Sequence, residues 1–237
     1  MALPIINTPT YELEVPSTDE KIKYRPFLVK EEKILMIAME SEEQSAIINA
    51  VKEIVSACTF DKVDILKMPM FDMEYIFLNI RAKSVGEVST VKLKCPDDNK
   101  TFAEVDVDLT EVKVQVSDNH TNKIELTDDM GIIMKYPSID SFENAGLTDI
   151  KAENMIDVIS SCILQIYEKG GEVIYYAKDS TKKELNDFIE QCNTKQFQDI
   201  QMFFDTMPSL KHTVKVKNPK TKVESEVTLS GLNDFFG

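Results

Sequence analysis

The sequence predicts an α+β fold in which amphipathic helices are combined with antiparallel β-hairpins. Several segments carry apolar residues at spacings of three, four and seven, which is typical of helices with one buried face. Other segments alternate apolar with polar residues on either side of a short polar turn, which is typical of hairpins.

Length and composition indicate a globular chain. It has 237 residues, of which 43% are hydrophobic and 29% charged, so it can bury a sizeable core. No segment approaches the roughly 20 apolar residues of a membrane helix, and the first twenty residues lack the pattern of a signal peptide. We therefore expect no membrane insertion and a location in the cytoplasm where the protein is made.

A β-hairpin is expected at the start of the chain. Apolar and charged residues alternate over residues 11–15 and again over residues 21–24, and residues 16–20 supply the turn. Pro26 then breaks the alternation, and helical spacing follows.

Three helices are predicted after Pro26. The second should begin at a capping box formed by Ser41 and Gln44, and Pro69 suits the first turn of the third. Because the third helix is apolar on nearly every side, we expect it to form the centre of the N-terminal core. The predicted buried residues are Ile34, Leu35, Ile37 and Ala38 in the first helix, Ile47, Ile48, Val51, Ile54, Val55 and Cys58 in the second, and Met70, Phe71, Met73, Tyr75, Ile76, Phe77, Leu78 and Ile80 in the third.

A β-rich section should follow the third helix. Val88, Val91 and Leu93 lead into a polar turn at residues 95–100, and an alternating strand runs to Leu109. Strands around residues 113–116 and 123–126 are expected to extend the same sheet.

The C-terminal part is predicted to be mostly helical. One amphipathic helix should run from Ala152 through Tyr167 and stop at Gly170 and Gly171. A capping box of Thr181 and Glu184 should start the next helix, which carries Leu185, Phe188, Ile189 and Cys192. Thr194 is the expected cap of a further helix, which carries Phe197, Ile200, Phe203, Phe204 and Met207 and is ended by Pro208. Residues 213–217 and 223–229 should form a closing hairpin.

We place a domain boundary near Tyr136, Pro137 and Ser138. This divides the chain into an N-terminal α+β part, residues 1–137, and a helical C-terminal part that closes with a hairpin, residues 138–237. One continuous domain is the alternative.

Two hairpin segments resemble each other in sequence. They are VKLKCPDDNKTFAEVDVDL and VKVKNPKTKVESEVTLSGL. An internal duplication would explain the likeness, and so would two unrelated hairpins that happen to share a proline turn. The sequence slightly favours the second explanation, because the helical content around the two segments differs.

The charge balance bears on the class of partner. Lys and Arg number 27 and Asp and Glu number 41, giving a formal net charge of −14. Such a surface repels phosphate backbones, and no basic stripe with interleaved aromatic residues occurs, so we expect no nucleic-acid binding. The acidic excess favours solubility, and a basic protein partner is the other interpretation.

Residues suited to nucleophilic or thiol chemistry occur without a recognisable motif. His120 and His212 are the two histidines, and both are interpreted as structural or solvent-facing. No glycine-rich phosphate-binding loop and no CxxC pair is present. Cys58, Cys162 and Cys192 fall on apolar helix faces, which favours a reduced protein over a disulfide scaffold.

Acidic pairs in turns are the remaining candidates for chemistry. Asp97 with Asp98, and Asp128 with Asp129, could bind a hard cation or share a proton, but solvated charge is the simpler interpretation. Hairpins of this length carry Cys or His pairs at their tips in zinc ribbons, whereas these tips keep Cys95 alone, with His212 preceding the other turn. We expect no catalytic residues, no metal and no cofactor.

Exposed apolar side chains offer a further possibility. The chain contains 11 Met and 12 Phe, and Met on a helix face usually belongs to a core. The terminal pair Phe235 and Phe236 is a candidate partner contact, although folding back onto the last helices is the favoured interpretation.

Three segments together resemble the T4-like bacteriophage baseplate hub protein family. They are LPIINTPTYELEVPSTDEKIKYRPFLVKEEKILMIAMES, MPMFDMEYIFLNIRAKSVGE, and FFDTMPSLKHTVKV with the closing SGLNDFFG. The resemblance covers nearly the whole chain and brings no catalytic or metal-binding residues with it.

What the resemblance implies is a component of the baseplate hub, or an assembly factor for it, acting through protein–protein interaction during contractile tail morphogenesis. The implied partners are other baseplate and tail hub proteins. The implied locations are the host cytoplasm during assembly and the baseplate of the virion tail. The alternatives are an unrecognised enzyme, such as a tail-associated hydrolase, and an unrelated bacterial adaptor.

Overall fold

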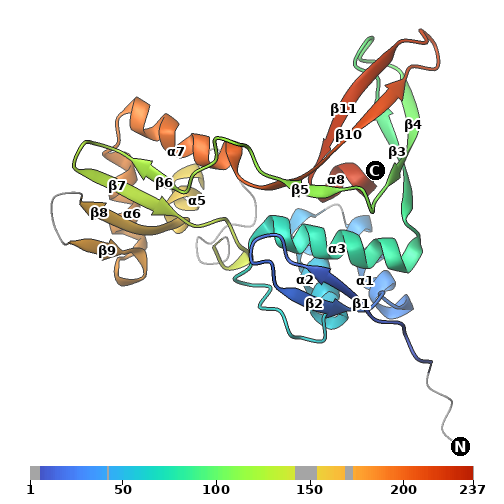
Figure 1. The fold of residues 1–237 in the computed structure, drawn as a ribbon, viewed down its shortest axis with the longest axis horizontal. Helices are drawn as coiled ribbons and strands as arrows, with labels where there is room; N and C mark the ends of the chain where they lie inside the picture. The colour runs from blue at the N-terminus through green and yellow to red at the C-terminus, as the bar shows by residue number, and fades with distance from the viewer. Residues whose placement is uncertain (1–5, 42, 142–153, 169–172, 237) are drawn as a thin grey trace, which may run out of the picture. The chain divides into compact units, whose positions relative to one another are not determined.

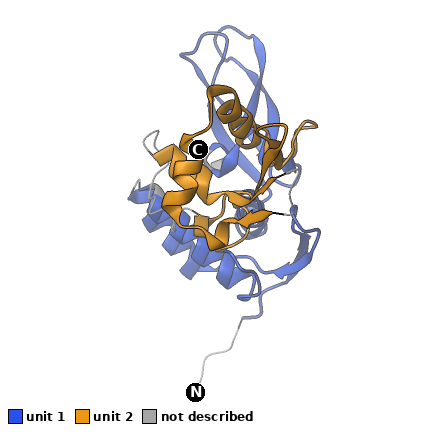
Figure 2. Ribbon diagram, turned by 90° about the vertical axis from the view of Figure 1, so that its left-hand side faces the viewer, with its two compact units in different colours: residues 1–65, 71–115, 209–237 blue, residues 66–70, 116–208 orange. Residues whose placement is uncertain are grey.

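The predicted α+β class is confirmed, with helices and small antiparallel sheets along the chain (Figure 1). The computed structural model describes residues 6–41, 43–141, 154–168 and 173–236, without the side chains of residues 44, 233 and 236. The chain divides into two compact units (Figure 2). The first comprises Met1–Ile65, Phe71–Gln115 and Ser209–Gly237, and the second comprises Leu66–Met70 and Val116–Pro208.

This division differs from the predicted halves 1–137 and 138–237, because Pro137 lies inside the second unit. Strand pairing explains the difference. The strand β10 (Ser209–Lys217) pairs with β5 (Lys113–Gln115) and with β11 (Glu224–Ser230), which returns the last segment of the chain to the first unit. Sequence position alone did not reveal this long-range pairing.

The first unit contains the hairpin predicted at the start of the chain. Strand β1 (Tyr11–Glu14) pairs with β2 (Lys21–Tyr24), Tyr11 opposite Tyr24. The other elements of this unit are α1 (Val29–Glu40), α2 (Gln44–Cys58), α3 (Met70–Val85), β3 (Val88–Lys94), β4 (Phe102–Asp108), β5, β10, β11 and α8 (Gly231–Phe236).

The helix α3 lies at the centre of the first unit, as predicted. Its buried residues occur all round the helix and include Phe77, Leu78 and Ile80. The buried carboxylate of Asp72 ties the helix to the first hairpin, since it accepts hydrogen bonds from the backbone N–H (3.1 Å) and the hydroxyl of Ser17. Both groups of a turn residue are thereby satisfied by one side chain of α3.

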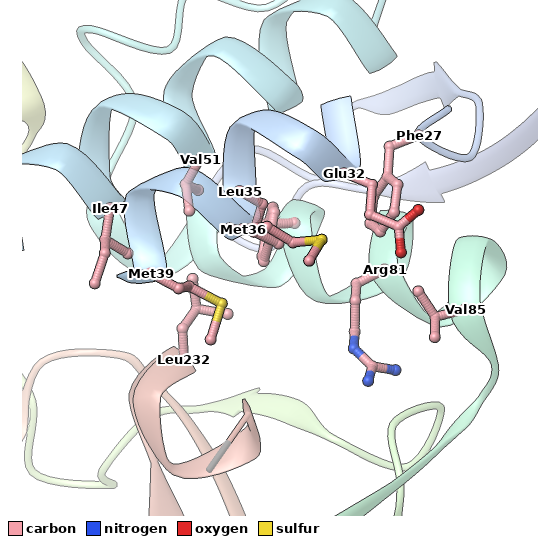
Figure 3. A pocket seen from close by; sticks show the side chains of 11 residues that line it. Phe27, Glu32, Leu35, Met36, Met39, Ile47, Val51, Arg81, Val85 and Leu232 are labelled. Atoms are coloured by element: carbon pink, nitrogen blue, oxygen red, sulfur yellow. The ribbon is translucent and has the colours of Figure 1, made fainter. Parts of the chain in front are cut away.

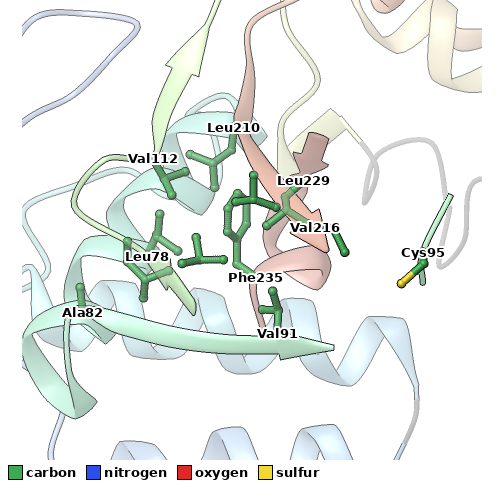
Figure 4. Close-up of a cluster of buried hydrophobic side chains, with 12 residues drawn as sticks. Leu78, Ala82, Val91, Cys95, Val112, Leu210, Val216, Leu229 and Phe235 are labelled. Atoms are coloured by element: carbon green, nitrogen blue, oxygen red, sulfur yellow. The ribbon is translucent and has the colours of Figure 1, made fainter. Parts of the chain in front are cut away.

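The hairpins β3–β4 and β10–β11 enclose one apolar cluster with α3 and α8 (Figure 4). The predicted inward residues Val91 and Val107 are buried in it, while Asp106 and Asp108 are exposed on the opposite face of β4. The buried members are Leu78, Ala82, Val91, Cys95, Val107, Leu109, Val112, Leu210, Val214, Val216, Leu229 and Phe235.

The second unit is built on a four-stranded antiparallel sheet. Its strand order is β6 (Lys123–Glu125), β7 (Met130–Met134), β8 (Ile163–Glu168) and β9 (Ile174–Tyr176). The remaining elements are α5 (Met155–Ser161), the short 3-10 helix η2 (Ala177–Asp179), α6 (Lys182–Glu190) and α7 (Thr194–Thr206). The core of this unit contains Ile132, Ile163, Ile189, Ile200 and Phe203.

The long helix predicted in the C-terminal part was wrong. The helix predicted from 152 to 167 ends after Ser161, and Ile163 begins a strand that pairs with a neighbour on each side. Ile163 and Ile166 have the i, i+3 spacing of a helix and point to opposite faces of the strand, so spacing favoured the helix. Pairing on both edges decides for the strand, which β-branched residues such as Ile suit. The predicted stop at Gly170 and Gly171 lies outside the described residues.

Strands do occur at the predicted positions 113–116 and 123–126, but neither extends the β3–β4 sheet. β5 pairs with β10, and β6 pairs with β7 in the second unit. Alternation predicts a strand without specifying its partner.

Helix caps were predicted in part. The capping box of Thr181 and Glu184 is confirmed. Ser41, however, closes α1, because its hydroxyl donates to the carbonyl oxygen of Ala38 (2.7 Å), and Glu43 is the N-cap of α2. The cap of α7 is Asn193 instead of Thr194: its side chain accepts the N–H of Gln196 at 3.0 Å.

Candidate functional site

An apolar groove on the first unit is the strongest candidate for a binding site (Figure 3). It holds about 450 Å³ of space between α1, α2, α3 and α8. It is lined by Phe27, Glu32, Leu35, Met36, Met39, Ile47, Val51, Phe77, Arg81, Val85 and Leu232.

A buried ion pair fixes the start of α1 beside this groove. The guanidinium of Arg25 lies 2.9 Å from the carboxylate of Glu31, with 14% and 3% of the two side chains exposed. The same carboxylate accepts the backbone N–H of Leu28 at 2.8 Å. Although burial opposes ionisation, the hydrogen bonds from Arg25 and Leu28 lower the pKa of Glu31. The segment YRPFLVKEEK thus has a structural explanation: it sets the position of α1.

The outer face of α1 is unusually apolar. Met36 and Ile37 are each 58% exposed and Met39 is 46% exposed, whereas Ala38 is buried. Ile37 was predicted on the buried side, and that was wrong, because α1 packs through Glu31 and Ala38. Clustered exposed apolar side chains are typical of interaction surfaces, and Met adapts to irregular partners.

Opposite charges flank the apolar lining. Glu32 of α1 and Arg81 of α3 both line the groove, and Figure 3 shows their charged ends beside Val85. Burial lowers the pKa of Arg81, whose guanidinium also donates to the carbonyl oxygen of Gly86 at 3.3 Å. The groove therefore combines an apolar lining with one acidic and one basic side chain, Glu32 and Arg81.

Leu232 reaches the groove from the first turn of α8. The carboxyl of Glu74 on α3 accepts the backbone N–H of Leu232, while burial raises the pKa of Glu74 to about 7. This contact fixes α8, and through it Leu232, against the central helix.

A second apolar pocket lies within the second unit, to which Met70, the first residue of α3, belongs. It holds about 550 Å³ and is lined mainly by Met70, Pro137, Met155, Val158, Ile159, Phe204 and Met207. Gln201 and Asp205 supply its polar lining. Its exposed methionine, Met155 at 39%, is more buried than those of α1, so the groove on the first unit is the better candidate.

The two histidines lie in different units, and His120 has a structural role. Its ring nitrogens lie 3.0 Å from the hydroxyls of Thr206 and Tyr136, and its ring packs against Phe203. Burial lowers the pKa of His120. His212 stands opposite Leu229 in the β10–β11 ladder.

The acidic pairs also lie in different units. Asp97 accepts hydrogen bonds from Asn218 and Thr221, and Asp98 accepts them from Lys100 and Thr101, so both carboxylates organise turns. Asp128 and Asp129 are exposed in the β6–β7 turn. Among the described residues, no three His, Cys, Asp or Glu side chains gather as metal ligands would.

The four cysteines are free thiols, with Cys58, Cys95 and Cys162 buried and Cys192 partly buried. Burial raises the pKa of Cys58 and of Cys162 to about 11, and it also raises the pKa of Cys192. Protonated thiols of this kind are poor nucleophiles. No helix in the part of the chain that the structure describes is long and apolar enough to cross a bilayer.

The candidate contact residue Phe235 is fully buried. It folds back onto the cluster formed by α3 and the two hairpins (Figure 4), and the hydroxyl of Ser89 donates to its carbonyl oxygen at 3.0 Å. The packing surface is thus different from the last helices that the sequence suggested. The side chain of Phe236 lies outside the described residues, and a partner contact by this pair stays a prediction.

The structure is that of an α+β protein of two compact units with an apolar groove on the first. A model of the family described as T4 bacteriophage base plate protein matches residues 8–237, which is essentially the whole chain. The chain therefore belongs to the T4 bacteriophage base plate protein family, and the resemblance seen in the sequence is confirmed. Comparisons with curated proteins and with solved structures give no match.

Proposed function

We propose that this baseplate protein is a component of the tail hub, or a factor that assembles it, and that it works by protein–protein interaction without catalysis. The host cytoplasm is its place of action during contractile tail assembly, and the virion baseplate is its destination if it is retained. The observation that carries the proposal is the exposed apolar face of α1 beside the groove, in a chain of this family.

The partner we propose is an apolar segment of another tail protein with basic residues beside it. The apolar lining suits an apolar insert, and the unbranched side chains of Met36 and Met39 can adapt to its shape. Glu32 at the groove and the net charge of −14 favour flanking Lys or Arg residues. The same charge disfavours nucleic acid as the partner.

The substitution Met36→Asp tests this proposal. It places a charge in the apolar surface without touching the core, so the chain should fold normally while hub assembly in infected cells falls at least about tenfold. The measurement is quantitative mass spectrometry of this chain in isolated hub intermediates and purified virions, together with infectious titre.

Met202→Asp is the matched control. Met202 is 55% exposed on α7, close to the 58% of Met36, and it lines neither the groove nor the second pocket. The control should assemble like the unaltered chain. Normal assembly of Met36→Asp would refute the groove as the docking site, and absence of the unaltered chain from both hub intermediates and virions would refute the hub role itself.

A further inference from the structure

The hairpins β3–β4 and β10–β11 match each other residue pair by residue pair. When the first strands are aligned on VKLK and VKVK and the second strands on EVDV and EVTL, equivalent residues stand opposite equivalent partners. The turn between the strands is one residue shorter in the second hairpin, since Cys95 hydrogen-bonds back to Thr101 and Asn218 to Val223. The matching pairs are Val91↔Val105 with Val214↔Val227, Lys92↔Glu104 with Lys215↔Glu226, and Leu93↔Ala103 with Val216↔Ser225. A shift of one residue in either register would have reversed which face is buried, so the agreement is specific.

The two tips share one turn as well. The N–H of Asn99 donates to the carbonyl oxygen of Cys95 at 3.0 Å, and the N–H of Lys222 donates to that of Asn218 at 2.9 Å. Asn99 and Lys222 both have positive φ, 52° and 65°. Each tip has a proline directly after its first residue.

Side chains at the two tips meet within the first unit. The carboxylate of Asp97 accepts the amide N–H of Asn218 at 2.9 Å and 3.1 Å and the hydroxyl of Thr221 at 2.5 Å. Asn218 and Cys95 are both buried at the base of their turns. Three charge-assisted hydrogen bonds thus close one hairpin tip onto the other.

The turn positions have the spacing of a zinc knuckle. Cys95 and Asp98 are separated by two residues, as are Asn218 and Thr221, and paired knuckles of this C-x-x-C spacing at hairpin tips hold a tetrahedral metal ion. These four positions, 95, 98, 218 and 221, are called the knuckle positions, and only Cys95 among them supplies a thiol. Asp97 stands between the knuckle positions of its own tip and binds both knuckle positions of the other.

We infer that the two hairpins are copies of one unit. Their tips are held together by the hydrogen bonds of Asp97 to Asn218 and Thr221, a contact called the clasp, and the two turns have the geometry of a paired metal knuckle. Asp97 joins the two turns in the way that a shared metal ion would. Positions 95, 98, 218 and 221 should accordingly bind Zn²⁺ or Co²⁺ once thiols occupy them all. The arrangement goes beyond the hub role, because it concerns how this arm of the first unit is held closed.

The triple substitution Asp98→Cys, Asn218→Cys and Thr221→Cys tests the knuckle geometry alongside the native Cys95. One Co²⁺ per chain should bind with the visible absorption of tetrahedral thiolate coordination. The control keeps four thiols but moves two of them, using Lys100→Cys, Asn218→Cys and Lys222→Cys. The knuckle variant should bind at least about 100-fold more tightly than this control. Equal binding by the two folded variants would overturn the inference.

A second measurement tests the clasp in the otherwise unaltered chain. Asp97→Ala should speed hydrogen exchange at the amides of Asn99 and Lys222 by about tenfold, because the hydrogen bonds between the two turns are lost. Asp108→Ala is the control, since Asp108 is an exposed carboxylate that bonds Thr110 at the far end of β4. Unchanged exchange at both tips in Asp97→Ala would show that the contact does not hold the hairpins together, whatever the metal result.

Discussion

At the scale of single residues, Glu74 is a carboxyl whose surroundings disfavour its charge. Its carboxyl is desolvated on the central helix, and its one identified protein donor is the N–H of Leu232. Burial without a cation disfavours the charged form, which is why the pKa rises to about 7 from 4.5. The opposite case is Glu31, where Arg25 supports the charge.

Glu74 makes the stability of the first unit depend on pH. Its pKa is higher in the folded chain than in the unfolded chain, so the folded state binds the extra proton between pH 4.5 and 7. The free energy of unfolding should therefore fall as pH rises through this range, by up to about 3 kcal/mol. Glu74→Gln keeps an acceptor for Leu232 and should remove this fall. Urea titrations at pH 5 and pH 7.5 measure it.

The exposed substitution Glu224→Gln serves as the control, because its side chain is 64% exposed beside Lys217. It should leave the pH dependence of the unaltered chain in place. If Glu74→Gln shows the same difference between pH 5 and pH 7.5 as the unaltered chain, the carboxyl of Glu74 is not held in its neutral form.

At the scale of the elements, the N-cap of α7 is Asn193, one residue before the predicted Thr194. Asn193 and Gln196 satisfy each other's backbone N–H groups, at 3.0 Å and 2.8 Å, and Thr194 is already helical. Asn193→Ala should lower the free energy of unfolding by about 1 kcal/mol, and Thr194→Ala by less than about 0.5 kcal/mol. Chemical denaturation of the two variants distinguishes them. The reverse ranking would mean that the helix begins at Thr194 after all.

Sequence patterns predicted elements with one clear buried face and failed where two patterns fitted the same residues. The α2 stripe and the alternation in β4 are unambiguous, and both elements are confirmed. Ile163 and Ile166 have helical spacing although Ile itself suits a strand, and pairing with β7 and β9 decides for the strand. The short apolar strand β7, MGIIM, carries no alternation and was not predicted.

The candidate groove could be predicted only in part. The sequence indicates that α1 is apolar, but apolar spacing implies burial, and the exposure of Met36, Ile37 and Met39 depends on what α1 packs against. The likeness of the two hairpins was visible in the sequence, which nevertheless slightly favoured two unrelated hairpins. Their strand registers and the contacts of Asp97 could be seen only in the folded structure, because they join residues far apart in the sequence.

At the scale of the whole molecule, two separate cores are the main feature. The chain passes between the units four times, at residues 65–66, 70–71, 115–116 and 208–209. Each unit closes its own apolar cluster, around Phe235 in the first and around Phe203 in the second. Stability in such a chain is expected to be local to each core.

The matched substitutions Phe235→Ala and Phe203→Ala test whether the cores open independently. Both side chains are almost fully buried, at 0% and 2% exposure, so each truncation should cost about 3–5 kcal/mol. Phe235→Ala should accelerate hydrogen exchange in α3 and β3 and leave β7 and β8 protected, while Phe203→Ala should do the reverse. Because the two variants lose the same group, each is the control for the other. Acceleration of exchange throughout the chain by either variant would mean that the protein unfolds as one continuous domain.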